Sequence, residues 1–371
     1  MRAVRWHGRR DVRYETVPDA PAPGPEEVRV AVAWCGLCGT DLLEYREGPI
    51  EIPTRPHPVT GGRAPVVLGH EVSGFVDAVG AGVSGLAPGA LVALNALIPC
   101  GRCALCAGGA YHLCPDFGHI GMSADGGLAE LVTVPARMVV AAPGGLDPAV
   151  AALAEPFAVA WHLVRRLGRP GGREGLIVGA GSIGLATALI LRAEGDAVTL
   201  ADVGEERLAV PRALGLPTRR ADLDPPASAA DLTVDCTGTG PGFALACAAA
   251  RPGGTVGLAG LPGAPVPFDV AAAAKRELTL VGSMSHQTTA DLRPALAFLA
   301  QHAEAAAALV TGRVPLSDAV TGGLDVLTGA ERGRHIKILV AANPTDNDRN
   351  GSESGSKVGQ KPGSPNKERR R

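Results

Sequence analysis

Four cysteines within a stretch of fifteen residues offer the most specific chemistry in this sequence. Their spacing is Cys100-x2-Cys103-x2-Cys106-x7-Cys114, in the segment CGRCALCAGGAYHLC. Four thiolates at such short spacing can surround one Zn²⁺ tetrahedrally. Since a closed set of four protein ligands leaves no open position for a substrate, we expect a structural zinc here.

The alternative for these cysteines is a pair of disulfides or a group of buried thiols. Disulfides are typical of secreted proteins, but the N-terminal residues MRAVRWH show no apolar segment and no cleavage site of a signal peptide. We therefore expect a cytoplasmic protein in which the clustered cysteines bind metal. The isolated Cys35, Cys236 and Cys247 are interpreted as buried thiols.

A glycine-rich segment further along the chain predicts a dinucleotide site. Residues 179–184 read GAGSIG, follow the apolar run 175–178 and precede a predicted helix. In that context the three glycines allow a tight turn, close approach of backbone amides to a pyrophosphate, and close packing of helix on strand. The helix N-terminus then faces the phosphates. The candidate cofactor-binding residues of this loop are Gly179, Gly181, Ser182, Ile183 and Gly184.

An acidic residue follows the glycine motif at the distance that coenzyme selection requires. Asp202 lies eighteen residues after Gly184, at the end of the next predicted strand. A carboxylate there accepts hydrogen bonds from the ribose hydroxyls and repels a 2′-phosphate, which favours NAD over NADP. Arg207 is a candidate for covering the adenosine ribose. The alternative for the whole segment is a glycine-rich turn followed by a surface aspartate.

The elements that position these residues follow two patterns. Up to about residue 145, short β segments such as 28–35, 91–94, 129–134 and 138–141 are separated by Gly and Pro turn signals. This pattern indicates an all-β region of Greek-key or barrel type. A long apolar stretch, 148–167, is then predicted to be one helix.

After that helix, predicted strands alternate with helices of about a dozen residues. The strands are expected at 175–178, 197–201, 232–235, 255–259 and 278–281, with helices at 182–194 and 205–214. Such alternation predicts a parallel sheet with helical crossovers. The remainder, 289–342, is predicted as helix, strand, helix, strand, and its last strand, 336–340, is expected to return to the first domain.

Length and charge exclude several classes of protein. A chain of 371 residues with net charge −2 predicts about two domains and no electrostatic attraction to nucleic acid. No apolar run approaches the roughly 18 residues of a transmembrane helix. Residues 343–371 carry seven Lys and Arg against four Asp and Glu, and Val358 is their only aliphatic residue, which predicts a disordered tail.

At this point the sequence resembles the zinc-containing medium-chain alcohol dehydrogenases, most closely the butanediol, sorbitol and threonine dehydrogenase branch. The resemblance covers residues 1–340 and rests on several blocks in the family's order. These blocks are Cys35–Asp41 (CGLCGTD), Gly69–Glu71 (GHE), the four cysteines, Leu153–Pro156 (LAEP), the glycine motif and Asp235–Gly238 (DCTG).

The resemblance implies an α/β fold of two domains. A GroES-like β domain that carries two zinc sites would comprise residues 1–155 and 290–342, and a Rossmann domain with a doubly wound parallel sheet would comprise 156–289. It also implies two Zn²⁺ per chain, NAD as cofactor, a small-molecule alcohol or ketone as substrate, and a homo-oligomer, either dimer or tetramer.

A second zinc site is implied by the same resemblance, with Cys38 and His70 as direct ligands. A catalytic zinc needs about three protein ligands and one open position. The resemblance places Glu155 as the third ligand, yet Glu71 stands beside His70 and is an equal candidate, so the choice between the two carboxylates stays open. At the open position zinc would lower the pKa of the substrate hydroxyl, and hydride would pass to the nicotinamide.

Three further residues acquire expectations from the resemblance. Thr40 is expected to pass on the substrate proton through its hydroxyl, and Lys337 is a candidate for the pyrophosphate. Leu43 departs from the family, which usually places a histidine there to carry that proton to bulk water. The proton must therefore leave by another route, or the pocket is remodelled for an unusual substrate.

Together these features predict a zinc-dependent oxidoreductase that transfers a hydride between a secondary alcohol, most plausibly a vicinal diol or polyol, and NAD. Two alternatives stay open. One is a threonine-type amino-alcohol dehydrogenase, for which no group that binds a substrate carboxylate was identified. The other is a NAD-binding scaffold or sensor with weakened catalysis, for which Leu43 is the only hint.

Overall fold

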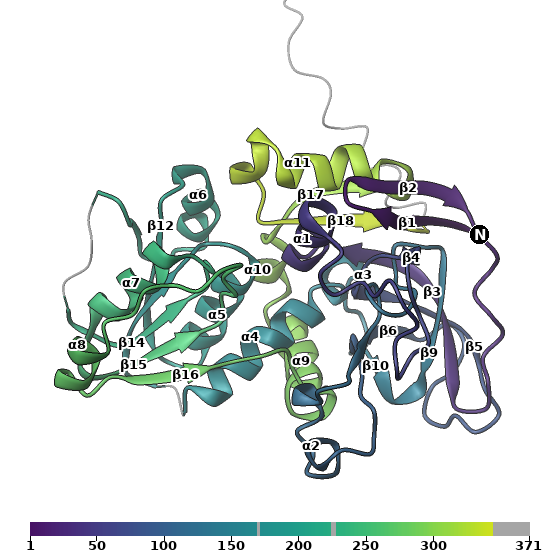
Figure 1. Ribbon diagram of the computed structural model, residues 1–371, viewed down its shortest axis with the longest axis horizontal. Coiled ribbons are helices and arrows are strands. Elements are labelled where there is room, and N and C mark those ends of the chain that lie inside the picture. Colours follow the sequence, from purple (N-terminus) through teal and green to yellow (C-terminus); the bar gives the residue numbers. More distant parts are fainter. Residues whose placement is uncertain (169–170, 224–227, 344–371) are drawn as a thin grey trace, which may run out of the picture.

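The computed structural model describes residues 1–168, 171–223 and 228–343, and the predicted disordered tail lies outside these residues except for Asn343. The chain forms two halves, each built on its own large sheet (Figure 1). The α/β architecture with a β-rich first half and a parallel-sheet second half confirms the predicted fold class. None of the described helices is long and apolar enough to cross a membrane.

The first half is built on a seven-stranded mixed sheet. In spatial order its strands are β10 (Val139–Ala141), β6 (Leu91–Leu94), β5 (Glu71–Val79), β3 (Glu27–Gly36), β18 (Lys337–Ala341) and β17 (Val310–Pro315), with β9 (Leu131–Pro135) also paired to β3. β3 alternates buried valines at 28, 30 and 32 with less buried residues, as expected of a strand that covers a core on one face.

The last strand confirms the predicted return of the chain to the first half. β18 pairs antiparallel with β3 and parallel with β17, so residues more than 300 positions apart are neighbours in one sheet. β18 is buried along its whole length because strands cover both of its edges. This pairing brings Lys337 into the first half of the molecule.

Small β elements complete this half. A three-stranded sheet consists of β2 (Asp11–Thr16), β1 (Arg2–Gly8) and β4 (Val66–Val67), and a two-stranded sheet consists of β7 (Leu97–Ile98) and β8 (Gly118–His119). The helices here are α1 (Gly39–Glu47), α2 (Ala104–Ala107), α3 (Pro148–Ala151), α10 (Ala303–Ala307) and α11 (Asp325–Thr328). Sequence reasoning predicted none of β1, β2, β5 or α1.

The second half is a six-stranded parallel sheet. In spatial order its strands are β13 (Thr218–Arg220), β12 (Ala197–Asp202), β11 (Glu174–Val178), β14 (Ala230–Asp235), β15 (Ala250–Leu258) and β16 (Thr279–Gly282). Its helices are α5 (Ser182–Ala193), α6 (Glu205–Ala213), α7 (Gly240–Ala249) and α8 (Val270–Lys275). The strand order reverses between β11 and β14, which is the switch point at which doubly wound sheets bind ligands.

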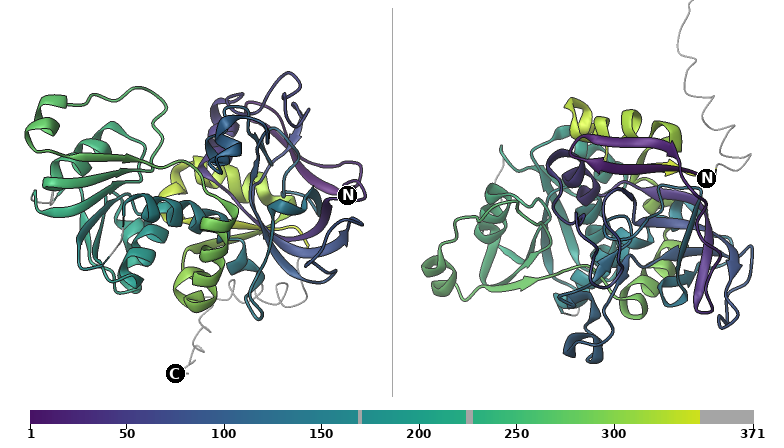
Figure 2. Two further views of the ribbon diagram at one scale, coloured as in Figure 1. Left: turned by 90° about the horizontal axis from the view of Figure 1, so that it is seen from below. Right: turned by 45° about the vertical axis from the view of Figure 1, so that its right-hand side comes forward.

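Helices α4 (Ala154–Arg166) and α9 (Arg293–Gln301) pack against each other and join the halves. α4 contacts α5 of the second half and β5 of the first, and it also packs on the π-helix η3 (Thr288–Leu292) (Figures 1 and 2). The single helix expected over 148–167 is wrong, because α3 and α4 are separate and Ala152 and Leu153 lie between them. The expected domain boundaries stay predictions. The boundary at 155/156 falls inside α4, and the one at 289/290 falls inside η3.

Candidate functional site

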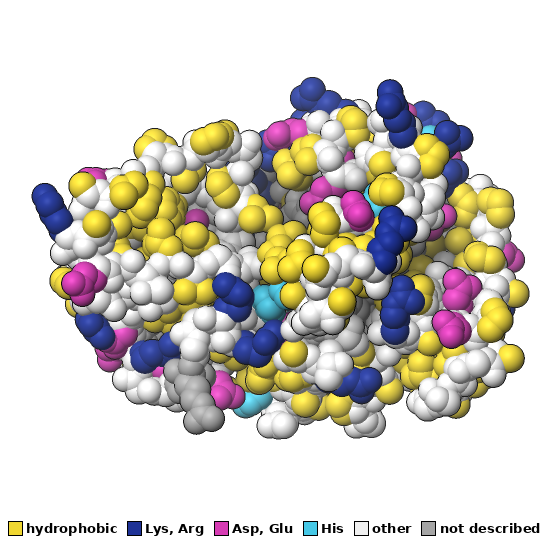
Figure 3. Space-filling view, turned by 60° about the horizontal axis from the view of Figure 1, so that its bottom comes forward, with side chains coloured by type: hydrophobic (Ala, Val, Ile, Leu, Met, Phe, Trp, Pro, Cys, Tyr) yellow, Lys and Arg dark blue, Asp and Glu magenta, His cyan; other side chains and the backbone are white. Residues whose placement is uncertain are grey.

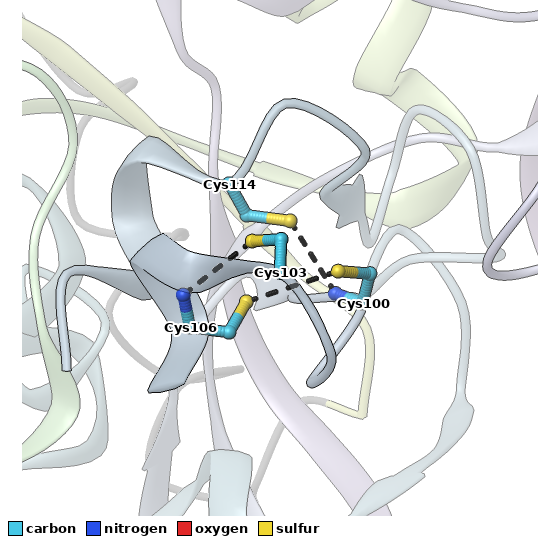
Figure 4. Close-up of side chains that lie close together, drawn as sticks. All are labelled: Cys100, Cys103, Cys106 and Cys114. Carbon is cyan, nitrogen blue, oxygen red and sulfur yellow. Dashed lines mark hydrogen bonds between the residues drawn. The ribbon is translucent and has the colours of Figure 1, made fainter. Parts of the chain in front are cut away.

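The four clustered cysteines converge in a small lobe around α2 (Figure 4). Their sulfur atoms all lie within 4.8 Å of one another, and the Sγ atoms of Cys100 and Cys106 are 3.9 Å apart. Four sulfurs bound tetrahedrally at about 2.3 Å from one zinc would lie about 3.8 Å from each other. Since all eight cysteines of the chain have free thiols, the geometry fits a metal and excludes the disulfide alternative.

Backbone amides of the lobe donate hydrogen bonds to the cysteine sulfurs. The amide of Cys106 donates to the Cys103 sulfur at 3.4 Å, and the amide of Cys100 donates to the Cys114 sulfur at 3.5 Å. Backbone hydrogen bonds from Arg102 and Cys103 lower the pKa of Cys100 to about 6, whereas burial raises the pKa of Cys106 to about 12. A bound zinc would deprotonate such coordinating thiols outright.

The glycine motif lies at the switch point of the parallel sheet. Gly179 has a φ of +103°, a conformation that favours glycine, and a Cβ at Gly184 would overlap the Gly179 carbonyl oxygen. The loop therefore needs its first and third glycines for the two reasons expected. α5 begins at Ser182, whose hydroxyl donates to the Ile336 carbonyl oxygen at 2.8 Å and so connects the loop to the start of β18.

A cavity of about 750 Å³ opens beside this loop, and its lining includes Gly179, Gly181, Asp202 and Arg207. Asp202 accepts the Ala180 amide at 2.8 Å through Oδ2 and the Gly204 amide at 2.8 Å through Oδ1. Its carboxylate is thus held at the end of β12, where a ribose would lie. Arg207 reaches over Gly181 from α6, and its guanidinium donates to the Arg332 carbonyl oxygen at 3.1 Å. The structure thus places four predicted residues at one cavity: Gly179, Gly181, Asp202 and Arg207.

The first two candidate ligands of the second metal site lie close together near the start of α1. Cys38 is the residue before α1, and its amide donates to Asp41 Oδ2 at 2.9 Å. The other oxygen of Asp41 lies 3.7 Å from Nδ1 of His70, and both side chains are buried. Burial alone would lower the pKa of His70, but Asp41 and Cys38 raise it well above its usual value. A carboxylate that orients a histidine is typical of metal sites.

Glu155 faces the same group from the first turn of α4. Its carboxylate is 8% exposed and its nearest ionisable partner is His286, with Nδ1 3.6 Å from Oε1. Burial raises the pKa of Glu155 to about 7, and His70 is the next group that acts on it. Among the described residues only the cysteine cluster has all its ligand atoms within 4.8 Å, so Cys38, His70 and Glu155 are neighbours without that degree of convergence.

Glu71 is engaged elsewhere, although it follows His70 in the sequence. Both of its carboxylate oxygens lie 2.7 Å from Nζ of Lys337, which also donates to the Leu37 carbonyl oxygen at 2.9 Å. Both side chains are buried, and a Cβ at Gly36 would overlap the Glu71 carboxylate. The ammonium of Lys337 therefore lies beside the candidate metal ligands, and its role toward a pyrophosphate stays a prediction.

Several acidic groups surround His70 and Lys337. The side chains of Cys38, Asp41, Glu71 and Glu155 act electrostatically on one another, on His70 or on Lys337. The donor set, a thiolate, an imidazole and a carboxylate, is one that zinc accepts.

Thr40 and Leu43 lie on the first turn of α1 and the turn after it. The Cys38 sulfur and the Thr40 hydroxyl oxygen are 3.8 Å apart, so Thr40 borders the candidate metal site as expected. Leu43 is three residues further on the same helix, which places both side chains on one face.

Four side chains near this site were not given a role by sequence reasoning: Asp41, Glu51, His119 and His286. Asp41 belongs to a quoted motif, and its spacing of three residues from Cys38 is a local signal that could have suggested the observed bond to the Cys38 amide. The other three come from the loop after α1, from β8 and from the segment after β16. Only the tertiary structure brings them together.

Comparison with known protein families agrees with both halves of the chain. The family model described as "Alcohol dehydrogenase GroES-like domain" matches residues 24–144, and the one described as "Zinc-binding dehydrogenase" matches residues 182–301. The first contains Cys38, His70 and the cysteine lobe, and the second begins at the N-terminus of α5.

Individual proteins similar to this chain share nearly its whole length. A (R,R)-butanediol dehydrogenase of Neisseria gonorrhoeae is 32% identical over 92% of this chain and 100% of its own. The crystal structure of 2R,3R-butanediol dehydrogenase from Bacillus subtilis has a TM-score of 0.83 at 29% identity and covers 92% of this chain and 99% of its own. A protein of Sinorhizobium meliloti 1021, solved with bound NADP, has a TM-score of 0.82 at 29% identity and covers 92% and 98%.

Proposed function

The chain belongs to the zinc-binding alcohol dehydrogenases, and we propose that it oxidises a secondary alcohol with a neighbouring hydroxyl, a diol or polyol, using NAD, and reduces the corresponding ketone in reverse. The observation that carries the proposal is the group formed by Cys38, His70 and Glu155, three neighbouring zinc donors from separate elements, of which His70 and Glu155 are buried and Cys38 is half-buried. The butanediol dehydrogenases among its relatives support a diol as substrate.

We assign Cys38, His70 and Glu155 as ligands of the catalytic zinc, and Cys100, Cys103, Cys106 and Cys114 as ligands of the structural zinc. Glu155 is preferred over Glu71 as third ligand because Glu71 already receives two hydrogen bonds from Lys337. Asp41 lies beside His70 at 3.7 Å, and Lys337 forms a buried ion pair with Glu71 next to these ligands.

A zinc ion held by Cys38, His70 and Glu155 would lower the pKa of the substrate hydroxyl, and NAD would supply the acceptor for the hydride, so that the alcohol would lose two electrons and two hydrogens as H⁻ and H⁺. The protein's own residues supply position and a proton path. Thr40, beside the Cys38 sulfur, accepts the hydroxyl proton and donates its own onward. Gly179, Gly181, Asp202 and Arg207 bind the coenzyme from the second half of the chain.

The proposal is tested by an NAD-reduction screen over diols, polyols, amino alcohols and monoalcohols, with the zinc content measured on the same protein. Two zincs per chain together with NADH formation from a diol or polyol is the expected result. Two zincs without turnover of any alcohol would contradict the proposal and favour a coenzyme-binding scaffold, and turnover of amino alcohols alone would favour the threonine-type activity.

Coenzyme choice is predicted to depend on the charge of Asp202. Asp202→Asn keeps a side-chain acceptor for the Ala180 or Gly204 amide but removes the charge that repels a 2′-phosphate. We expect the ratio of kcat/KM for NAD over NADP to fall by about 10-fold or more, since like charges at an interface cost several kcal/mol. Steady-state kinetics with both coenzymes measure this ratio. An unchanged ratio in the Asn variant, or a wild type that prefers NADP, would contradict the assignment.

Proton release is predicted to improve when a histidine is restored next to Thr40. Leu43→His places an imidazole with an ordinary pKa near 6.5 on the helix face of Thr40. We expect kcat at pH 7 to rise several-fold, because a positioned base contributes about 10²-fold or more where proton transfer is limiting. The pH dependence of kcat is the measurement, and Leu43→Phe controls for size. A pH–rate profile identical to the wild type would count against this route.

We also propose a homo-oligomer and a cytoplasmic location. The outer strand β16 pairs with β15 only, and exposed apolar side chains lie on and near it: Leu261, Phe268, Val270, Leu280 and Met284. Figure 3 shows hydrophobic side chains on the surface of both halves of the molecule. A second copy that covers this edge would bury the apolar side chains near it. Eight free thiols support a reducing compartment.

A further inference from the structure

Three polar side chains beside the candidate zinc ligands have no role in the chemistry described above. The ring of His119 lies 4.7 Å from the ring of His70, centroid to centroid, and Nδ1 of His119 lies 3.9 Å from Oε2 of Glu51. On the other side, Nδ1 of His286 lies 3.6 Å from Oε1 of Glu155. The three residues thus flank the ligand set at His70 and at Glu155.

Glu51 is positioned through its backbone amide, which donates to the carboxylate of Glu44. The buried carboxylate of Glu44 accepts the amide of Glu51 and also those of Ile50 and Ile52, at 3.1 and 3.2 Å. This fixes the loop after α1. The side chain of Glu51 is 44% exposed, and its carboxylate has no hydrogen-bond partner among the described residues. The fixed backbone thus places an acceptor without a hydrogen-bond partner 3.9 Å from Nδ1 of His119 at the edge of the site.

His286 is the strongest sign of a missing partner. Its side chain is fully buried, and neither ring nitrogen has a hydrogen-bond partner in the part of the chain that the structure describes. The same holds for Nδ1 of His119. Buried polar atoms nearly always have hydrogen-bond partners, and a buried polar atom without such a bond destabilises the fold. Since the protein supplies none here, the partner comes from outside the chain.

The chemistry of the three groups selects the kind of partner. Glu51 offers two acceptor oxygens, and each neutral imidazole offers one donor and one acceptor. Hydroxyl groups satisfy both kinds of atom, whereas an alkyl chain satisfies neither. An ammonium group fits less well, because it only donates hydrogen bonds and cannot satisfy the donor nitrogen of each imidazole.

We propose that Glu51, His119 and His286 bind the non-reacting hydroxyls of the substrate and make the enzyme selective for polyols over alkyl alcohols and alkyl diols. The inference rests on the proposed function, since it concerns the substrate of the same site. It identifies three specificity-determining residues that the ligand set and the coenzyme site do not include.

The test compares kcat/KM for xylitol, 2,3-butanediol and 2-butanol in the zinc-loaded full-length protein with NAD. In Glu51→Leu and in His119→Phe we expect kcat/KM for xylitol to fall by about 10- to 100-fold, mainly through KM, because a site built to bind a hydroxyl loses that contact. The value for 2-butanol is expected to stay within about twofold or to rise. The matched control is Glu47→Leu, whose carboxylate is 50% exposed and pairs with Arg46 on the same helix.

Zinc content and circular dichroism establish that each variant is folded and loaded, and Glu51→Leu changes an exposed side chain whose backbone contacts remain. His286→Phe provides a third, buried position. An equal fall for xylitol and 2-butanol, or an unchanged xylitol value in both Glu51→Leu and His119→Phe, would overturn the recognition role. A wild type that oxidises alkyl diols but not polyols overturns this inference alone, whereas a wild type that oxidises no alcohol overturns the proposed function with it.

Discussion

Replacing Glu155 with glutamine is expected to lower the zinc content from two ions per chain to about one and to lower kcat/KM by about 10³-fold. A glutamine oxygen has no charge with which to replace a carboxylate ligand, and the structural cysteines keep their own ion. The Lewis-acid contribution of a catalytic metal is several kcal/mol, and each 1.36 kcal/mol is a factor of ten in rate. Metal analysis and steady-state kinetics on the same preparation measure both effects.

Glu71→Gln is the matched control, since Glu71 is the other carboxylate that sequence reasoning could not separate from Glu155. Its two oxygens are both bonded to Lys337, so both zincs are expected to remain. Loss of zinc in Glu71→Gln together with retention in Glu155→Gln would reverse the assignment. Loss in both variants would mean that the two carboxylates hold the ion together.

Glu71→Gln is instead expected to reduce the free energy of unfolding by about 3–5 kcal/mol, as is typical when one partner of a buried ion pair is removed. Lys337 is 3% exposed, and in Glu71→Gln its ammonium keeps the Leu37 carbonyl oxygen and one side-chain amide oxygen as acceptors but loses the negative charge that faces it. Burial lowers the pKa of Lys337, but Glu71 more than offsets this and raises it. The charge left behind is the source of the cost. Denaturant unfolding of the zinc-loaded protein measures the change.

The double variant Glu71→Gln/Lys337→Met distinguishes the cost of an unpaired buried charge from a general loss of the fold. With both charges removed we expect most of the lost stability to return, because an apolar replacement of a buried pair is often neutral or better. Asp231→Asn is the surface comparison: its partner Arg251 lies at 2.6 Å but both side chains are partly exposed, so the expected loss is below about 1 kcal/mol. A Glu71→Gln protein as stable as the wild type would show that water or another group reaches Lys337.

Local patterns determined much of what the sequence could predict. The four cysteines lie within fifteen residues, so a short loop alone brings their sulfurs within 4.8 Å. The glycine loop, β11, α5 and Asp202 also follow one another closely, and their predicted bounds agree with the structure to within a residue or two. The return of the last strand was predictable because five strands of the parallel sheet were already expected before it, and the structure adds β13 to them.

The parts that failed depend on contacts that no local pattern records. The residues between α3 and α4 are as apolar as the two helices themselves, so the sequence pattern predicted one continuous helix. β1, β2 and β5 carry polar residues and a glycine that weaken the strand pattern. β1 and β2 pair with each other as a hairpin, and β5 pairs with the more distant β3. Propensity is a weak signal wherever tertiary packing decides the element.

The sequence by itself therefore determined the family, the fold class and the ligand set as a list of candidates. Only the tertiary structure supplies the ground on which we propose Glu155 over Glu71, because that ground is the ion pair with Lys337, which lies 266 residues away and reaches Glu71 through the pairing of β18 with β3. It alone also brought Glu51, His119 and His286 to the site, from segments that are up to 235 residues apart. The physical reason is the same in each case: a buried charge or ring nitrogen is defined by the partner it meets, and that partner is chosen by the fold.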